Sequence, residues 1–187
     1  MHFKFILIFS AFFVPFNLVT AQERYKGFGI EGQSSLYSSF VKSKDFPIGF
    51  QFVSSWGASI NYYQTKMSYS VFLNKHQSFY SVANGLLLYR DYNGYECGIN
   101  FRRIFSELKT PHLYWGGGLM ISGNYDQYAL IEQYMVYPTI GFESFLLFHL
   151  LHKKIPFTIS IPFSYSFRES GHYSNAGLSF RIGLCFP

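Results

Sequence analysis

The chain has 187 residues and a formal net charge of +5, from 15 Lys and Arg against 10 Asp and Glu. Charged residues make up only 13 % of it, against roughly 25 % in ordinary soluble domains, while Phe, Tyr and Trp reach 22 %. The basic excess is spread along the chain, which argues against nucleic acid as a partner, and the length allows one domain of moderate size.

Residues 1–21 predict a secretory signal peptide. A short positive start precedes an apolar run over residues 5–16, and small residues lead up to Ala21. We expect cleavage after Ala21, which leaves residues 22–187 as one exported domain. The alternative is an uncleaved membrane anchor, but a proline and an asparagine interrupt a run that is already short for a span.

Strict alternation of apolar and polar side chains is clearest in the last third of the chain. Aromatic and branched residues alternate with small and polar ones over residues 155–168, and the pattern resumes up to residue 186 after a polar connection at 169–174. Successive side chains of an extended chain point to opposite faces, so this pattern predicts a hairpin with one apolar face. A soluble sandwich would bury that face against a second sheet, whereas a membrane barrel would turn it to lipid.

The whole chain favours the barrel. After residue 21 no apolar run approaches the length of a membrane-spanning helix, yet the composition is aromatic and poor in charge. Closure of a sheet satisfies every backbone group inside hydrocarbon. We therefore predict an all-β fold, a transmembrane antiparallel up-and-down β-barrel in the bacterial outer membrane.

The number of strands depends on three breaks in the alternation, at Gln64 to Lys66, at Asn74 to His76 and at Asp91 to Gly94. Accepting all three as turns gives nine strands, but single-chain bacterial barrels have even numbers. We therefore interpret the break at Gln64 to Lys66 as a β-bulge and predict eight strands. Longer external loops are expected at residues 35–46 and 124–133, and short turns at 106–111 and 149–154.

Six charged side chains fall on the predicted inner face: Glu31, Glu96, Glu143, Arg102, Arg168 and Arg181. The interior of an eight-stranded barrel is only wide enough to be filled by side chains, and unpaired charges there would be costly. Three acids against three arginines predict a closed, salt-bridged lumen without an open pore. The alternative is a gated polar pathway through the same residues.

The two cysteines are expected on opposite sides of the wall, Cys97 outside and Cys185 inside, and therefore as free thiols. The histidines at positions 76, 112, 149 and 152 fall near the expected strand ends and are interpreted as interfacial residues. No zinc spacing, phosphate-binding loop or dinucleotide motif occurs, so we predict no metal and no cofactor.

One short segment has the residues of a hydrolase. His172 and Ser174 share a face of an extended chain, where a base can activate a hydroxyl, and the Asn175 amide could donate to an oxyanion. The segment resembles the His-x-Ser-Asn motif of the PagL family of outer-membrane lipid A deacylases. That resemblance implies His172 as base, Ser174 as nucleophile and Asn175 as oxyanion donor. No acidic residue follows the motif to orient the histidine, and the alternative interpretation is a polar loop entering the last strand.

A second resemblance extends over more of the chain. A glycine-rich start near residues 26–32, the strand around residues 116–125, the Gly141-Phe142-Glu143 strand and the glycine-alternating last strand are similar to the TraO family of Bacteroidetes conjugative transposons. This resemblance implies an accessory protein of a mating apparatus.

The final strand, closed by Phe186, also resembles the outer-membrane assembly signal. The sequence thus predicts a non-catalytic barrel with a structural or accessory role, and the lipid A deacylase is the alternative. The expected partners are outer-membrane lipid, the barrel-assembly machinery and an envelope protein bound through the external loops.

Overall fold

The computed structural model describes residues 26–43, 49–83, 86–88, 92–108, 113–128, 133–150, 154–168 and 171–186. These residues form nine strands: β1 (Gly27–Ser43), β2 (Gly49–Tyr63), β3 (Met67–Ala83), β4 (Leu86–Leu88), β5 (Tyr92–Glu107), β6 (Leu113–Tyr128), β7 (Gln133–Leu150), β8 (Ile155–Arg168) and β9 (Gly171–Phe186). Among the described residues, no helix is long and apolar enough to cross a membrane.

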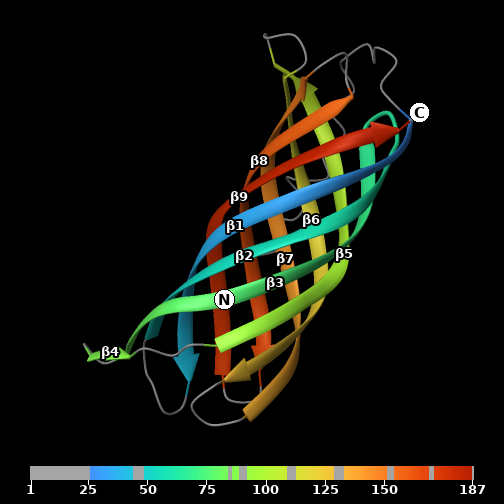
Figure 1. Ribbon diagram of the computed structural model, residues 1–187. Helices are drawn as coiled ribbons and strands as arrows, with labels where there is room; N and C mark the ends of the chain where they lie inside the picture. The colour runs from blue at the N-terminus through green and yellow to red at the C-terminus, as the bar shows by residue number, and fades with distance from the viewer. Residues whose placement is uncertain are drawn as a thin grey trace.

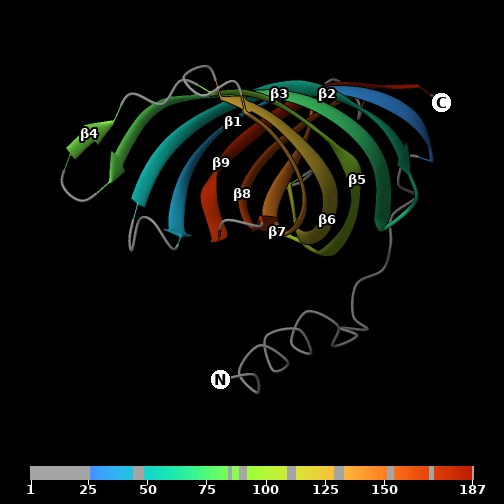
Figure 2. The same cartoon turned by 90° about the horizontal axis from the view of Figure 1, so that it is seen from below.

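Eight of the strands close into a barrel. The long strands pair antiparallel in the order β2-β1-β9-β8-β7-β6-β5-β3, and a further pairing of β2 with β3 completes the ring. The ninth strand, β4, is three residues long and pairs only with the end of β3, so it stands away from the ring (Figures 1 and 2). The predicted fold, an antiparallel up-and-down barrel of eight strands, is confirmed.

The alternation of side chains explains why the sheet closes. On β8 the inward Thr158 and Ser160 are each 1 % exposed, whereas the outward Ile161 and Phe163 are about half exposed. The same division continues around the ring, and the outer surface is covered by branched and aromatic side chains. Such a surface is stable against lipid, and a closed ring leaves no unpaired sheet edge inside the hydrocarbon.

The two ends of the barrel differ. Gly27 pairs with Tyr63 and Phe28 with Phe186, so both ends of the described chain lie at the same end, together with the short connection at residues 64–66. We call it the terminal end; it lies at the upper right of Figure 1 and β4 at the lower left. We call the opposite end the far end. Short periplasmic turns are typical of such barrels, and the three-residue connection between β2 and β3 favours the periplasmic side for the terminal end.

The predicted bulge at Gln64 to Lys66 is wrong. These residues form the turn between β2 and β3, where the backbone N–H of Gln64 donates to Met67 O at 2.7 Å. The ladder shifts register elsewhere, between Phe52 and Val53 of β2 and between Ile104 and Ser106 of β5. The predicted strand number is right for a different reason: the other two expected turns lie inside strands, and the chain instead reverses between the end of β3 at Ala83 and the start of β5 at Tyr92.

Those two expected turns lie inside strands. Asn74 and His76 belong to β3, and Asn93 and Gly94 belong to β5, where His76 pairs with Gly94. Their polarity suggested turns, but Asn74 and His76 are buried in the lumen. A polar inner face continues along the strand without breaking it.

The predicted external loops are also largely strand. β1 continues through residues 35–43 with Ser35 and Ser39 buried inside, and residues 124–128 belong to β6. The expected connection at 169–174 is shortened because β9 begins at Gly171. In the first two segments, serine and asparagine on the inner face have the composition that is typical of a loop.

The expected turns at 106–111 and 149–154 begin later than predicted. Residues 106–107 close β5 and residues 149–150 close β7. The rest of these two segments lies outside the described residues, except for Leu108, whose backbone N–H donates to Leu113 O at 2.9 Å, and Lys154, which precedes β8.

Candidate functional site in the barrel lumen

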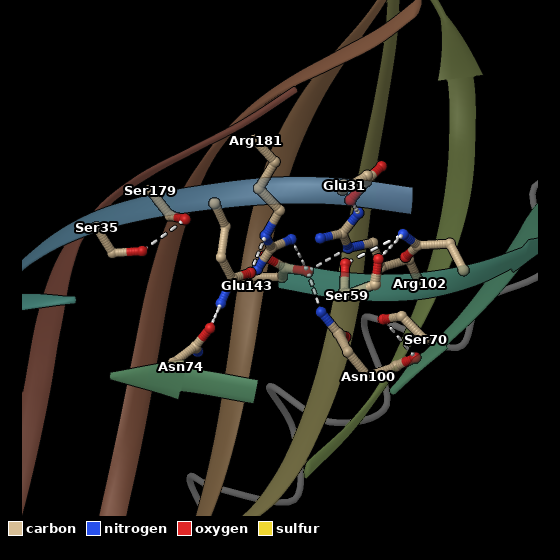
Figure 3. A network of polar contacts seen from close by, with 12 residues as sticks. Glu31, Ser35, Ser59, Ser70, Asn74, Asn100, Arg102, Glu143, Ser179 and Arg181 are labelled. Atoms are coloured by element: carbon tan, nitrogen blue, oxygen red, sulfur yellow. Dashed lines mark hydrogen bonds and ion pairs between the residues drawn. The ribbon is translucent and has the colours of Figure 1, made fainter. Parts of the chain in front are cut away.

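Four charged side chains meet in the middle of the lumen, each from a different strand. Glu31, Arg102, Glu143 and Arg181, which we call the central ion cluster, come from β1, β5, β7 and β9 and are at most 6 % exposed (Figure 3). Each occupies an inward position of its strand, and the closure of the ring brings the four side chains together.

Arg102 is the centre of this cluster. Its Nη1 lies 3.3 Å from Oε2 of Glu31, and its Nε donates to Oε1 of Glu143 at 2.8 Å. Arg181 Nη1 lies 2.9 Å from Oε2 and 3.1 Å from Oε1 of Glu143. Two acids thus face two arginines, and charge balance is what a buried ionic group requires.

Neutral groups extend the cluster toward both ends. At the terminal end the Tyr63 hydroxyl donates to Oε1 of Glu31 at 2.6 Å. On the other side Arg181 Nε donates to Gln33 Oε1 at 3.0 Å, and the Gln33 amide donates to Asn74. Asn74 Nδ2 in turn donates to Oε2 of Glu96 at 3.2 Å. An unbroken series of side-chain contacts therefore runs across the lumen from Tyr63 to Glu96.

The structure brings together four of the six predicted lumen charges. Glu96 is buried but lies next to no arginine among the described side chains; it accepts hydrogen bonds from Asn74 and from Ser122 at 2.7 Å. The side chain of Arg168 lies outside the described residues. The predicted balance of three acids and three arginines thus holds for two of each.

A second group of buried polar contacts was missed from the sequence. His76 Nε2 and Asp126 Oδ1 lie 2.6 Å apart, and the Tyr137 hydroxyl donates to Asp126 Oδ2 at 2.7 Å. We call these three residues, all buried, the far-end cluster. Asp126 had been assigned to a loop and His76 to a turn. The signal was present, since Asp126 is in phase with the inward Ser122 and Asn124.

Two small cavities lie in the lumen among the described side chains. A cavity of about 40 Å³ lies at the terminal end, bounded by Glu31 and Arg102 and by the apolar Phe145 and Leu147. A cavity of about 50 Å³ lies toward the far end, bounded by Glu96, His76 and several hydroxyls, including Ser55. The central ion cluster separates the two cavities, each large enough for only a few water molecules.

The candidate hydrolase residues are divided between the two faces of β9. Ser174 is exposed on the outer face, and His172 is in phase with it, although its side chain lies outside the described residues. Asn175 points into the lumen, where it accepts from Ser39 and donates to Ser164 Oγ at 3.0 Å. The structure therefore separates the Asn175 amide from the hydroxyl of Ser174.

The two cysteines lie as predicted. Cys97 is exposed on the outer face, Cys185 is buried inside, and both are free thiols. Within the described part of the chain, no group of three or more His, Cys, Asp or Glu side chains is placed to hold a metal ion.

A ring of eight antiparallel strands with an apolar exterior and a lumen filled by paired ions is the construction of a small outer-membrane β-barrel. The chain is a member of this class by fold. No protein-family model and no curated protein sequence matches it.

Solved structures show the likeness. Neisserial surface protein A (NspA) aligns with a TM-score of 0.65 and 13 % sequence identity, over 88 % of this chain and 100 % of that one. Ail, the attachment invasion locus protein of Yersinia pestis, aligns with a TM-score of 0.49 and 13 % identity, over 86 % of this chain and 100 % of its own. The likeness to NspA supports the fold and the outer-membrane location, and the PagL-like and TraO-like motifs gain no support from these comparisons.

Proposed function

We propose that the protein is a non-catalytic structural or accessory barrel of the outer membrane, closed to solutes, which acts through the surface at its far end. The observation that carries this proposal is the central ion cluster. Its four side chains join β1, β5, β7 and β9 across the lumen and leave cavities of only about 40 and 50 Å³ on either side. A filled lumen leaves the outer surface and the strand ends for interaction.

The surface at the far end consists mainly of strand, since β1 reaches Ser43 and β6 reaches Tyr128. An envelope protein would therefore bind to ordered strand ends rather than to the long loops expected from the sequence. Within this role we favour an accessory part in conjugative transfer, which the resemblance to the TraO family supports. The barrel-assembly machinery is the second proposed partner, through the last strand.

Reconstitution tests the closed lumen. Liposomes that contain the purified protein should release a small trapped solute no faster than protein-free liposomes. A porin, whose larger barrel leaves an aqueous channel, should release it readily in the same assay. Solute release by this protein would contradict the proposal and favour a polar pathway through the lumen.

Two experiments in cells test the role. Mass spectrometry of lipid A should show the same acyl chains with and without the protein, whereas loss of a chain that depends on Ser174 would favour the deacylase instead. Deletion of the gene should lower the frequency of conjugative transfer. Unchanged transfer would remove the accessory role in conjugation and leave the structural one.

A further inference from the structure

A shallow depression of about 490 Å³ lies on the rim of the terminal end. It is lined by the following residues of β2, β3, the turn between them and the start of the chain's described part: Lys26, Tyr62, Gln64, Thr65, Lys66 and Met67. The ladder explains the placement, because Gly27 pairs with Tyr63 and brings Lys26 beside the turn that holds Lys66.

Positive charge gathers around this depression. Lys26 and Lys66 line it, and the exposed Arg103 lies on the outer face of β5, opposite Met67 in the ladder. No ion pair among the described residues involves Lys26, Lys66 or Arg103. Among the described residues, none of these three cations therefore has a carboxylate within ion-pair distance.

Apolar, lipid-facing side chains border the same depression. Tyr62 and Met67 are 38 % and 39 % exposed, and the Tyr62 ring packs on Phe28 with ring centroids 5.1 Å apart. Val71, two residues beyond Tyr69 on the same face of β3, continues the apolar strip toward the middle of the membrane. Charge at the rim and an apolar strip below it match the two parts of a phospholipid.

We propose that this depression binds an anionic glycerophospholipid of the periplasmic leaflet, with its phosphate between Lys26 and Lys66 and an acyl chain along the strip from Met67 to Val71. Arg103 contributes long-range attraction to the same headgroup. The position of the depression favours a lipid, because it opens where the lipid-facing surface ends. A soluble anion would gain nothing from Met67 or Tyr62.

Native mass spectrometry of the full protein in non-ionic detergent tests the site, with phosphatidylglycerol and phosphatidylethanolamine as probes. The wild-type protein should retain one phosphatidylglycerol in preference to phosphatidylethanolamine. Each lysine near an anionic headgroup contributes about 1 kcal/mol, so the K26Q/K66Q variant, which loses two of them, should bind phosphatidylglycerol about thirtyfold more weakly. The K26R/K66R variant should bind it nearly as well as the wild type.

Lys154 provides the matched control. It lies on the rim of the terminal end beside β8 and does not line the depression, so K154Q removes one positive charge from the same rim without touching the site. Equal losses in K154Q and K26Q/K66Q would mean diffuse attraction and overturn the proposal. So would equal retention of the two lipids, or displacement of phosphatidylglycerol by millimolar inorganic phosphate. Circular dichroism of each variant confirms that the barrel is intact, which is expected because both lysines are on the surface.

Discussion

The central ion cluster and the far-end cluster are both buried in the same lumen, yet they fill it in different ways. In the centre, Arg102 and Arg181 reach across from opposite walls to two carboxylates. At the far end, a single carboxylate, Asp126, is held by His76 and by the Tyr137 hydroxyl. Long charged side chains close the centre, whereas short polar ones dominate the far end.

The side chains around the two clusters also differ. Arg102 lies over the Phe145 ring, 5.8 Å from its centroid, and Phe145 packs with Tyr114 and Leu147 into an apolar cluster at the terminal end. The far-end cavity is lined by hydroxyls, and the buried Ser55 Oγ has no hydrogen-bond partner among the described residues. The comparison indicates that the ion pairs which cross the lumen lie in the centre, while the far end is filled by one carboxylate and by neutral polar groups.

Arg102→Ala, in the central ion cluster, should cause the largest loss of unfolding free energy. It leaves Glu31 and Glu143 buried without their shared partner, and removal of one member of a buried ion pair costs about 3–5 kcal/mol. We expect a loss of unfolding free energy of that size in urea titrations in lipid vesicles, together with solute release. Arg103→Ala is the matched control, because the next side chain lies on the outer face and should change both properties little. Equal effects of the two substitutions would contradict a special role for the centre.

Asp126→Asn should have a smaller effect. The amide keeps the shape of the carboxylate but loses the charge that His76 and Tyr137 share, at a cost of about 1–3 kcal/mol. The unfolding free energy should fall by that amount in the same titration, and the lumen should stay closed because the central ion cluster is untouched. A loss as large as that of Arg102→Ala would show that the two clusters contribute equally.

The smallest expected effect concerns two buried serines, one with a hydrogen-bond partner and one without in the described part of the chain. Ser35 and Ser55 are 3 % and 2 % exposed, but Ser35 Oγ donates to Ser179 Oγ at 2.8 Å, whereas Ser55 Oγ has no partner among the described residues. Ser35→Ala should cost about 0.5–1.5 kcal/mol, and Ser55→Ala close to nothing, since no hydrogen bond is lost. Unfolding free energies of the two variants measure the difference directly. A larger loss for Ser55→Ala would reveal a partner for its hydroxyl.

The barrel and its faces could be predicted because each strand carries the information in its own alternation. Glu31, Arg102 and Arg181 were assigned to the lumen from the phase of their neighbours alone, and the structure places all three there. The bounds predicted for the strand at residues 155–168 are those of β8. The phase of the alternation depends only on local sequence, so it can be predicted without knowledge of the rest of the fold.

The pairing inside the lumen could not be predicted in the same way. Glu31 and Arg102 are 71 residues apart, and phase fixes their side of the wall but not their height along the barrel. Height depends on the register of every intervening ladder, including its shifts at Phe52 and at Ile104. His76 and Asp126 were missed for a related reason, because polar inner faces near strand ends have the composition of loops.

The length of the strands has a consequence for what the cell presents outward. β1 has 17 residues and β7 has 18, whereas roughly 9–11 residues of a tilted strand cross a bilayer. The additional strand residues extend the hydrogen-bonded wall of the barrel beyond the hydrocarbon region of the membrane. An antibody or another protein that binds from outside would contact side chains whose spacing is fixed by the sheet. A peptide tag is best inserted in the short connections between neighbouring strands.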